Sequence, residues 1–387
     1  MPWHKKRVYL DVAAGVVGNS SSPHEEGRAT KAVLEEARRD IARLVEVQAD
    51  DVIFTSGATE SNAIAILGIP RALRARGASN IHALYLSTAH ASIVENMKVL
   101  ESEGVAIEAL PIRESRVDTE ALRAMLRPET VLVAMEAVCG ETGVVWNTRA
   151  VAEVLQKYKI GHDMSDLGGH LVSTRLRVFL HVDASQASLT EKISREHFGA
   201  DTLTLDGAKV GPRGIGLLVA HRTIPMAPLY AGGGQERGVR PGSEAPELAR
   251  EFAAALHAAT DGAPAFRAAA ERRRVELVTN LTAIPGLVIN EGRTQAPNIL
   301  NLSLLGRDTD YLVALLDEAG FALATRSACE TDSMTGSRAV EALMGDAARA
   351  RATLRVSWGS ATRPRDLTDF AKALSRAVAF IDSANKR

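Results

Sequence analysis

The residues best suited to chemistry in this sequence are a carboxylate and an amine, each placed where a buried strand is predicted to end. Asp183 closes one apolar run, and Lys209 follows a second run in a stretch rich in glycine. Ligands of open α/β sheets bind at the carboxyl ends of the strands. A lysine there is poorly placed for solvation and well placed to form a Schiff base. Taken alone, Asp183 could equally cap a helix or sit in a buried ion pair.

A third candidate is the segment 55–62, TSGATESN, which lies between a predicted strand and a predicted helix. Its small residues let the backbone approach an anion, and the helix after it presents free N–H groups and a positive dipole end. Ser and Thr are also the preferred N-caps, so capping and phosphate binding are equally favoured. With Asp183 and Lys209, this segment suits pyridoxal phosphate (PLP), whose pyridine nitrogen needs a carboxylate and whose aldehyde needs an amine.

One of only two cysteines, Cys329, sits in a polar stretch rather than on an apolar face. A free cysteine is usually buried and inert, so this setting favours a reactive thiol. Arg355, on a short predicted strand, could grip a carboxylate in bidentate fashion, although a surface ion pair is the simpler interpretation. The second cysteine is Cys139, and two cysteines exclude a disulfide framework and fit a reducing cytoplasm.

The elements that must position these residues alternate between short β-branched runs and amphipathic helical stretches. Strands are predicted at 52–55, 83–87, 131–136, 178–183, 202–205 and 215–220, and helices at 29–45, 60–67, 91–103, 119–126 and 148–157. This alternation predicts an α/β fold with a mostly parallel sheet covered by helices on both faces. We assign it to a large domain at residues 1–244.

After about residue 244 the pattern changes. A long helical region at about 244–280 is punctuated by Gly262 and Pro264, and strands at 287–290 and 299–304 precede a helix at 309–319. A further strand, the polar loop around Cys329, a strand at 354–357 and a C-terminal helix complete a smaller α+β domain at 245–387. A chain of 387 residues suits two domains.

Bulk composition excludes several classes of protein. The net charge of -1 leaves no broad basic footprint for nucleic acid or an anionic membrane surface. No apolar run approaches the ~20 residues of a membrane span, so we expect a soluble, cytoplasmic protein. The segment 161–175 fits no element and contains His162, Asp163, Asp166 and His170, but their spacing matches no metal motif. We therefore predict an inserted surface loop and no metal.

Taken together, these stretches resemble the cysteine desulfurases of PLP fold-type I, a class-V aminotransferase-like family, and in particular the group with the longer cysteine loop. The resemblance covers nearly the whole chain. It implies a large PLP-binding domain and a small C-terminal domain that carries the catalytic cysteine. The matching residues are Tyr9–Asp11, Gly18–His24, Glu26–Arg28, Thr55–Asn62, His90, Glu141, Gly143, Asp183, Gln186, Lys209, Gly232–Arg237, Arg240, Gly242, Ser327–Cys329 and Leu354–Ser357.

The resemblance implies a role for each residue around the cofactor. Lys209 would bind the aldehyde of PLP and move the Cα proton of the substrate. Asp183 would pair with the pyridine nitrogen, and Gln186 would hydrogen-bond the ring oxygen. Ala58 and Thr59 would hold the phosphate through backbone and hydroxyl groups.

The remaining implied roles concern the substrate and a second subunit. His90 would stack on the ring and assist proton transfer, and Arg355 would bind the substrate carboxylate. Ser243 would reach the phosphate of the partner subunit, which implies a homodimer with a shared active site. L-Cysteine would be converted to L-alanine, with its sulfur left as a persulfide on Cys329 for an acceptor protein such as an iron–sulfur scaffold. Another PLP-dependent lyase or aminotransferase, or a non-catalytic scaffold on this fold, is the alternative.

The chain departs from the family pattern at several positions. Gly140 stands where the family has an asparagine that touches cofactor and substrate, and Cys139 precedes it where a second asparagine is common. Asp206 replaces a phosphate-binding hydroxyl residue, and a carboxylate there would repel the phosphate unless it is turned away or protonated. Ala208 replaces a histidine just before the lysine. These changes bear on cofactor and substrate binding and leave Lys209 itself in place.

Overall fold

The computed structural model describes residues 7–16, 18–163, 177–325 and 336–384 of the chain. Its largest feature is a seven-stranded sheet with strand order β1-β9-β8-β7-β6-β2-β3. β9 runs antiparallel to both of its neighbours, and the pairs between β8 and β3 are parallel. The strands are β1 (Val52–Thr55), β2 (His82–Tyr85), β3 (Ala106–Ala109), β6 (Thr130–Glu136), β7 (Phe179–Asp183), β8 (Thr202–Asp206) and β9 (Gly216–Ala220).

Six of these strands were predicted from their apolar runs, and the mostly parallel sheet is confirmed. The seventh, β3, was not predicted because its residues are largely exposed at the sheet edge and lack an apolar run. A small hairpin of β4 (Ile112–Arg113) and β5 (Arg116–Val117) was also not predicted. Two-residue strands carry too little pattern to be recognised in a sequence.

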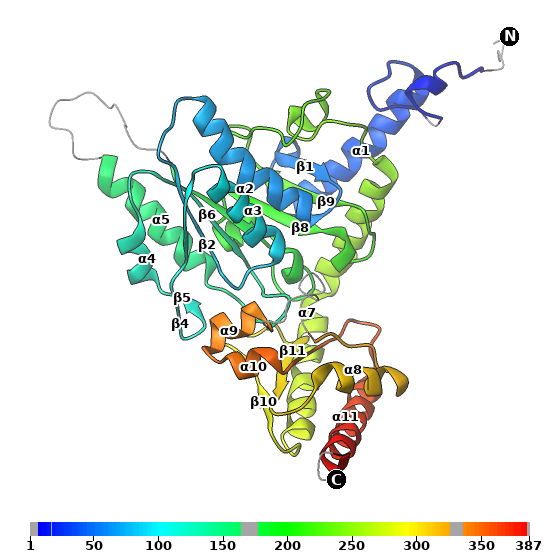
Figure 1. Cartoon of the computed structure of the whole chain (residues 1–387). Coiled ribbons are helices and arrows are strands. Elements are labelled where there is room, and N and C mark those ends of the chain that lie inside the picture. The colour runs from blue at the N-terminus through cyan, green and yellow to red at the C-terminus, as the bar shows by residue number, and fades with distance from the viewer. Residues whose placement is uncertain (1–6, 17, 164–176, 326–335, 385–387) are drawn as a thin grey trace.

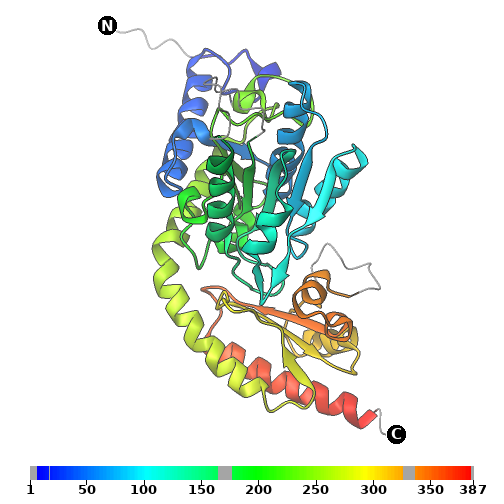
Figure 2. The same cartoon turned by 90° about the vertical axis from the view of Figure 1, so that its left-hand side faces the viewer.

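Helices lie on both sides of the large sheet (Figure 2). They are α1 (Glu25–Leu44), α2 (Ala58–Ala75), α3 (Ala91–Ser102), α4 (Thr119–Met125), α5 (Thr148–Asp163) and α6 (Arg195–Phe198). The predicted end of α2 at residue 67 is wrong, because the helix continues through Gly68 and Pro70. Gly68 serves packing here: a Cβ at this position would lie 2.7 Å from the carbonyl oxygen of Ala227.

The long helix α7 (Pro246–Leu281) joins two hydrophobic cores. Its first half buries Phe252 and Leu256 in the core of the large sheet, and its second half buries Leu277 and Leu281 in the second core. Figure 2 shows it running as one curved rod along the side of the molecule. The predicted long helical region is therefore confirmed, and Gly262 and Pro264 do not end the helix. A curve is expected where Pro264 removes one helical hydrogen bond.

The second core belongs to a three-stranded antiparallel sheet and its helices, which form the lower part of the molecule in Figure 1. The strands are β10 (Leu287–Ile289), β11 (Ile299–Leu304) and β12 (Thr353–Ser357), and the helices are α8 (Thr309–Glu318), α9 (Arg338–Met344), α10 (Ala347–Arg351) and α11 (Pro364–Ala384). In the described part of the chain, no helix has both the length and the apolar character needed to cross a membrane.

Candidate functional site

The carboxyl ends of β6, β7 and β8 bring the predicted carboxylate and amine to one edge of the large sheet. Asp183 is the last residue of β7 and is buried. β8 ends at Asp206, and a single 3-10 turn, η4 (Gly207–Lys209), places Lys209 just beyond the same edge with its side chain exposed. The parallel pairing of β7 with β8 fixes this arrangement. The sheet edge that the sequence predicted as a ligand site therefore carries both groups.

Asp183 is held by neutral donors. Its Oδ1 accepts the backbone N–H of Ser185 at 2.9 Å, and its Oδ2 accepts Asn62 Nδ2 at 2.7 Å. Asn62 is fully buried and also donates to Ser92 Oγ at 2.8 Å, while its Oδ1 lies 2.9 Å from His181 Nε2. Burial lowers the pKa of His181 to about 4, so this ring is neutral at physiological pH. Sequence reasoning assigned no role to Asn62.

His90 is the N-cap residue of α3. Glu136 contacts its backbone and Ser92 contacts its ring. Its backbone N–H donates to Glu136 Oε2 at 3.2 Å. Its ring Nδ1 accepts the backbone N–H of Ser92 at 3.2 Å and lies 2.9 Å from Ser92 Oγ. We call the set Asn62, Ser92, His90, His181 and Asp183 the Asp183 end of the site.

Glu136 is a buried acid beside this set that sequence reasoning did not identify. It closes β6 and is in register with Asp183 on β7, so both side chains project from the same face of the sheet. Burial raises its pKa well above the usual range, and the nearby charge of Asp183 raises it further. Its Oε1 is buried with no hydrogen-bond partner among the described residues. The only sequence signal was a glutamate that ends an otherwise apolar strand.

The predicted phosphate cradle lies at the N-terminus of α2. Gly57 caps this helix with a φ of 151°, a conformation that favours glycine, and no side chain caps the first amides. Ala58 is buried and Thr59 is exposed. Asp206 Oδ1 lies 4.0 Å from the position that a Cβ of Gly57 would take. We call Gly57, Ala58, Thr59 and Asp206 the Gly57 end of the site.

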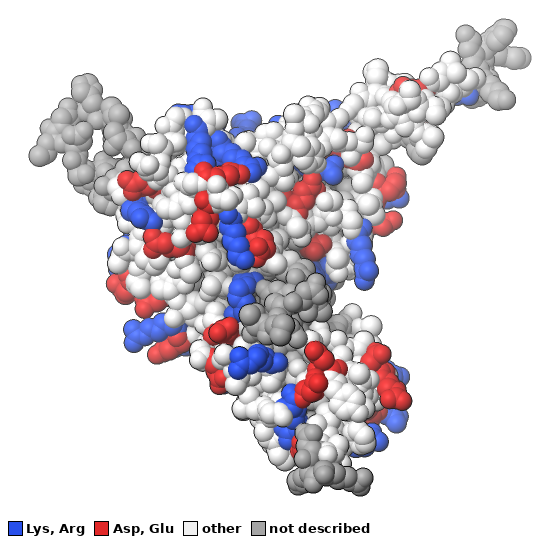
Figure 3. Space-filling view, viewed as in Figure 1, with Lys and Arg blue, Asp and Glu red and all other residues white. Residues whose placement is uncertain are grey.

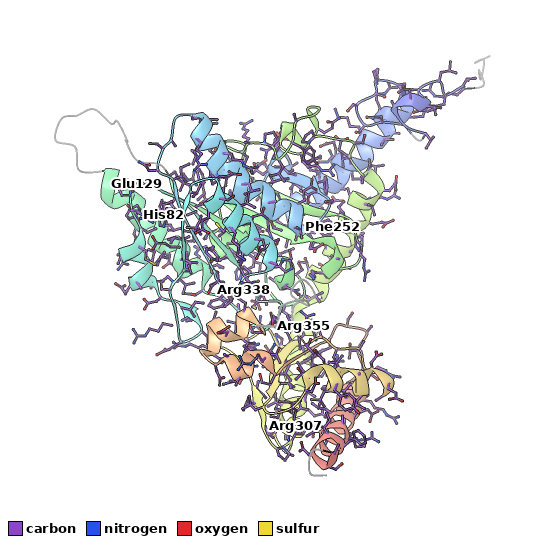
Figure 4. All side chains as sticks on the ribbon, viewed as in Figure 1. His82, Glu129, Phe252, Arg307, Arg338 and Arg355 are labelled. Carbon is purple, nitrogen blue, oxygen red and sulfur yellow. The ribbon has the colours of Figure 1, made fainter. Side chains whose placement is uncertain are left out.

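The region of β10, β11, β12 and the second core, which we call the small domain, meets the site through two arginines. Both are labelled at the junction of the two parts in Figure 4. Arg355 Nη1 donates to the carbonyl oxygen of Gly140 at 3.2 Å, and its backbone N–H donates to Ala324 at 2.7 Å. Arg338 Nη2 donates to the carbonyl oxygen of Ala89, next to His90, at 3.0 Å. Residues 324 and 338 flank the segment 326–335, so both flanks contact the site region. Cys329 itself lies outside the described residues.

A family model for class-V aminotransferases matches residues 6–370 of the chain. The chain belongs to this family. The mitochondrial cysteine desulfurase of Eremothecium gossypii is 30% identical over 378 residues, which cover 96% of this chain and 72% of that protein. A solved NifS-like protein superposes with a TM-score of 0.82 at 24% identity, covering 94% of this chain and 92% of that one. The structure of SspA in complex with cysteine gives a TM-score of 0.71 at 26% identity, covering 88% and 90%.

The chain therefore has the family and fold that its sequence pattern predicted, and its relatives are cysteine desulfurases. Proteins of this family depend on PLP. The residues present fit that cofactor: a buried carboxylate held by neutral donors, an exposed lysine at the next strand end, and a helix N-terminus without a side-chain cap. Asp206 and Glu60, in the first turn of α2, are carboxylates near this helix N-terminus and oppose a phosphate there.

The departures of this chain from the pattern of cysteine desulfurases have structural consequences. A Cβ at Gly140 would lie 2.8 Å from Gln186 Nε2, so the Gln186 side chain occupies space that the family's asparagine would need. Asp206 caps η4, because its Oδ1 accepts the backbone N–H of Ala208 at 3.0 Å. This bond fixes the carboxylate at the Gly57 end. Cys139 is buried, and burial raises the pKa of its thiol, so it is the inert member of the two cysteines.

Two predicted features fall at the margin of the described structure. Ser243 is exposed, and its carbonyl oxygen accepts Arg240 Nη1 at 3.4 Å; its predicted contact with a partner subunit stays a prediction. Most of the segment 161–175 lies outside the described residues. Among all the residues that the structure describes, no group of three His, Cys, Asp or Glu side chains could hold a metal ion.

On the face shown in Figure 3, positive and negative side chains are interspersed.

Proposed function

We propose that this chain converts L-cysteine to L-alanine and receives the sulfur on Cys329 as a persulfide. The observation that carries the proposal is that Asp183 and Lys209 lie at the carboxyl ends of neighbouring strands, with Arg355 bonded to Gly140, in a chain whose relatives are cysteine desulfurases. When bound, PLP would supply a ring that withdraws electrons from the amino-acid substrate. The complex of SspA with cysteine supports cysteine as the substrate class.

The residues of the chain would divide the work between binding and proton transfer. Lys209 Nζ would bind the cofactor aldehyde and then take the Cα proton of the substrate. Asp183 would keep the pyridine nitrogen protonated, and Gln186 would hydrogen-bond the ring oxygen. Ala58 and Thr59 would hold the phosphate. Arg355 is close enough to the Gly140 loop to place a substrate carboxylate there through a bidentate contact.

The sulfur step balances without an external oxidant. The Cys329 thiolate would attack the substrate sulfur, so that an S–S bond forms and the Cβ–S bond of the substrate breaks. The electron pair of the broken bond stays on Cβ, which takes up a proton and yields alanine. A thiol on an acceptor protein would then take the outer sulfur from Cys329. An iron–sulfur scaffold in the cytoplasm is the acceptor class that we propose.

Alanine and persulfide formation in single-turnover conditions test this function directly. Purified protein loaded with PLP should form one alanine per persulfide, and Cys329→Ser should lose both. Cys139→Ala is the matched control, because this buried thiol contacts neither the cofactor nor the substrate in the proposal. It should keep alanine formation within a few-fold of the unaltered protein. If alanine still forms at full rate in Cys329→Ser, sulfur leaves by elimination and the proposed desulfurase mechanism is wrong.

We also propose that two copies of the chain share each active site. The N-terminal arm, by which we mean the described residues before α1, exposes several apolar side chains. More than half of each side chain is exposed, which is unusual for apolar residues so closely spaced: Val8, Leu10, Val12 and Val16. The arm is tied to the segment that carries Ser243, because Ser20 Oγ donates to Glu244 Oε2 at 2.7 Å. Arm and Ser243 would therefore face the same second copy.

Mixing two inactive variants tests the shared site. Lys209→Ala lacks the amine, and Ser243→Asp would repel the phosphate of the partner subunit. A mixed dimer contains one site with Lys209 from one chain and Ser243 from the other. Random mixing should restore about a quarter of full activity, since half of the dimers would be mixed and each would have one intact site. No recovery with verified subunit exchange would contradict the shared site.

A further inference from the structure

The hydrogen bonds around His90 determine which of its ring nitrogens carries the hydrogen. A backbone amide can only donate, and the N–H of Ser92 points at His90 Nδ1 at 3.2 Å. Nδ1 must therefore offer a lone pair. A neutral imidazole that accepts at Nδ1 carries its hydrogen on Nε2.

The hydroxyl of Ser92 reinforces this assignment. Its oxygen accepts a hydrogen from Asn62 Nδ2 at 2.8 Å and lies 2.9 Å from His90 Nδ1. Since Nδ1 accepts, the hydroxyl hydrogen must point from Ser92 to His90. Nδ1 then receives two donors, and both fix the same tautomer.

The orientation of Asn62 is itself fixed from both sides. Its two Nδ2 hydrogens go to Asp183 Oδ2 and Ser92 Oγ, so its Oδ1 must accept from His181 Nε2. His181 is neutral and can supply that hydrogen, because its Nδ1 lies 2.9 Å from the Thr202 hydroxyl, which can donate to it. Hydrogen bonds thus run in one direction from His181 through Asn62 and Ser92 to the ring of His90, and successive bonds in such a chain polarise one another. Asp183 accepts the second Nδ2 hydrogen of Asn62 and so fixes the orientation of the amide.

We propose that Asn62 and Ser92 are positioning residues that hold His90 as the neutral tautomer with its hydrogen on Nε2. His90 then presents a hydrogen-bond donor to an acceptor atom of the cofactor or substrate and does not act as a base. Proton abstraction is left to Lys209. This narrows the proton-transfer role that the sequence suggested for His90, and it rests on the proposed function only for the identity of the acceptor.

The test is ring-nitrogen NMR on cofactor-free protein with 15N-labelled histidine, assigned by comparison with His90→Gln. The expected result is the large downfield shift of an unprotonated Nδ1 together with a protonated Nε2. Ser92→Thr keeps both donors and should look like the unaltered protein. Ser92→Pro removes both donors at a first-turn position, where proline is tolerated, and should yield a measurable population with hydrogen on Nδ1.

Two further variants keep the test decisive if Ser92→Pro fails to fold. Ser92→Ala removes only the hydroxyl and should produce the same change to a smaller extent. Asn96→Ala is the matched control on the same helix and should change nothing, since Asn96 Nδ2 donates to the carbonyl oxygen of Ser92 at 2.7 Å and not to either Ser92 donor. In the loaded enzyme, Ser92→Ala should lower kcat by roughly tenfold with KM little changed, and Ser92→Thr should restore it.

The proposal would be overturned if Nδ1 of His90 is protonated in the unaltered protein. It would also be overturned if the tautomer of His90 stays the same when the Ser92 donors are removed. The NMR result does not depend on desulfurase activity. A protein that shows the predicted tautomer but forms no alanine from cysteine would therefore refute the proposed function and leave this inference standing.

Discussion

The Asp183 end and the Gly57 end of the site differ in how much of their structure exists before a ligand arrives. At the Asp183 end, Asn62 and His181 are fully buried, and the Asn62 side chain is hydrogen-bonded to Asp183, Ser92 and His181. At the Gly57 end, Thr59 is exposed, the helix lacks a side-chain cap, and the carboxylate of Asp206 lies near the helix N-terminus. The first end is preorganised, whereas the second is to be completed by an anion or a second copy of the chain.

The largest effect is expected from the buried ion pair that supports the Gly57 end. Arg38 binds Glu236 through two contacts of 2.7 and 2.8 Å, and Glu236 also accepts the N–H of Phe54 in β1, the strand that leads to Gly57. Arg38→Leu would leave the Glu236 charge buried and unpaired, so the free energy of unfolding should fall by about 3–5 kcal/mol. Chemical denaturation measures this loss.

The control for that prediction is an exposed pair on the same helix. Arg43 contacts Asp40 at 2.6 Å, but its side chain is largely exposed, so Arg43→Leu should leave the free energy of unfolding nearly unchanged. Equal losses for Arg38→Leu and Arg43→Leu would show that the Gly57 end does not depend on the buried pair.

The next effect concerns the Asp183 end. Asp183→Asn keeps the shape of the side chain but removes its charge, so kcat should fall about a hundredfold or more and the absorbance spectrum of the bound cofactor should change. Asp201→Asn is the control, because Asp201 binds the N–H of Leu180 on the same strand and is placed outside the site. If the kcat of Asp183→Asn stays within a few-fold of that of the unaltered protein, the charge of Asp183 does not act on the cofactor.

A smaller effect should distinguish the two ends by ligand. Asp206→Ser removes a carboxylate near the phosphate cradle, so PLP affinity should rise about tenfold while the affinity for pyridoxal, which lacks the phosphate, stays the same. Titration of each ligand by absorbance measures both. Asp346→Ser is the control, because Asp346 also caps a helix but in the small domain. If Asp206→Ser binds both ligands more tightly, or neither, the carboxylate of Asp206 does not act on the phosphate.

The smallest effect is expected at Glu136. Its pKa is raised by burial, so the neutral form is favoured in the folded state and ionisation opposes folding. The stability that this neutral acid contributes is present below its unfolded pKa and is lost as pH rises toward the folded value. Glu136→Gln keeps an acceptor for His90 and cannot ionise, so it should stabilise the protein by about 1 kcal/mol. Thermal unfolding should show this gain growing from acidic to alkaline pH, and a gain that shrinks would contradict it.

The strands of the large sheet could be predicted because their signal is local. β1 and β11 were placed at the residues where the structure has them, since each is a short apolar run bounded by polar residues or turns. Gly262 and Pro264 do not end α7, although both residue types break helices by local propensity. Packing of α7 against two cores outweighs that propensity, and no window of sequence contains both cores.

The sequence alone determined the α/β class, the family, and the positions of Asp183 and Lys209 at strand ends. These depend on periodicity and on residue types a few positions apart. Only the tertiary structure decided that Glu136 lies beside Asp183, that Arg355 reaches Gly140, and that Asn62 joins Asp183 to Ser92. Such contacts connect residues far apart in the chain, and they follow from the order of strands in the sheet and the docking of the small domain, which local patterns do not encode.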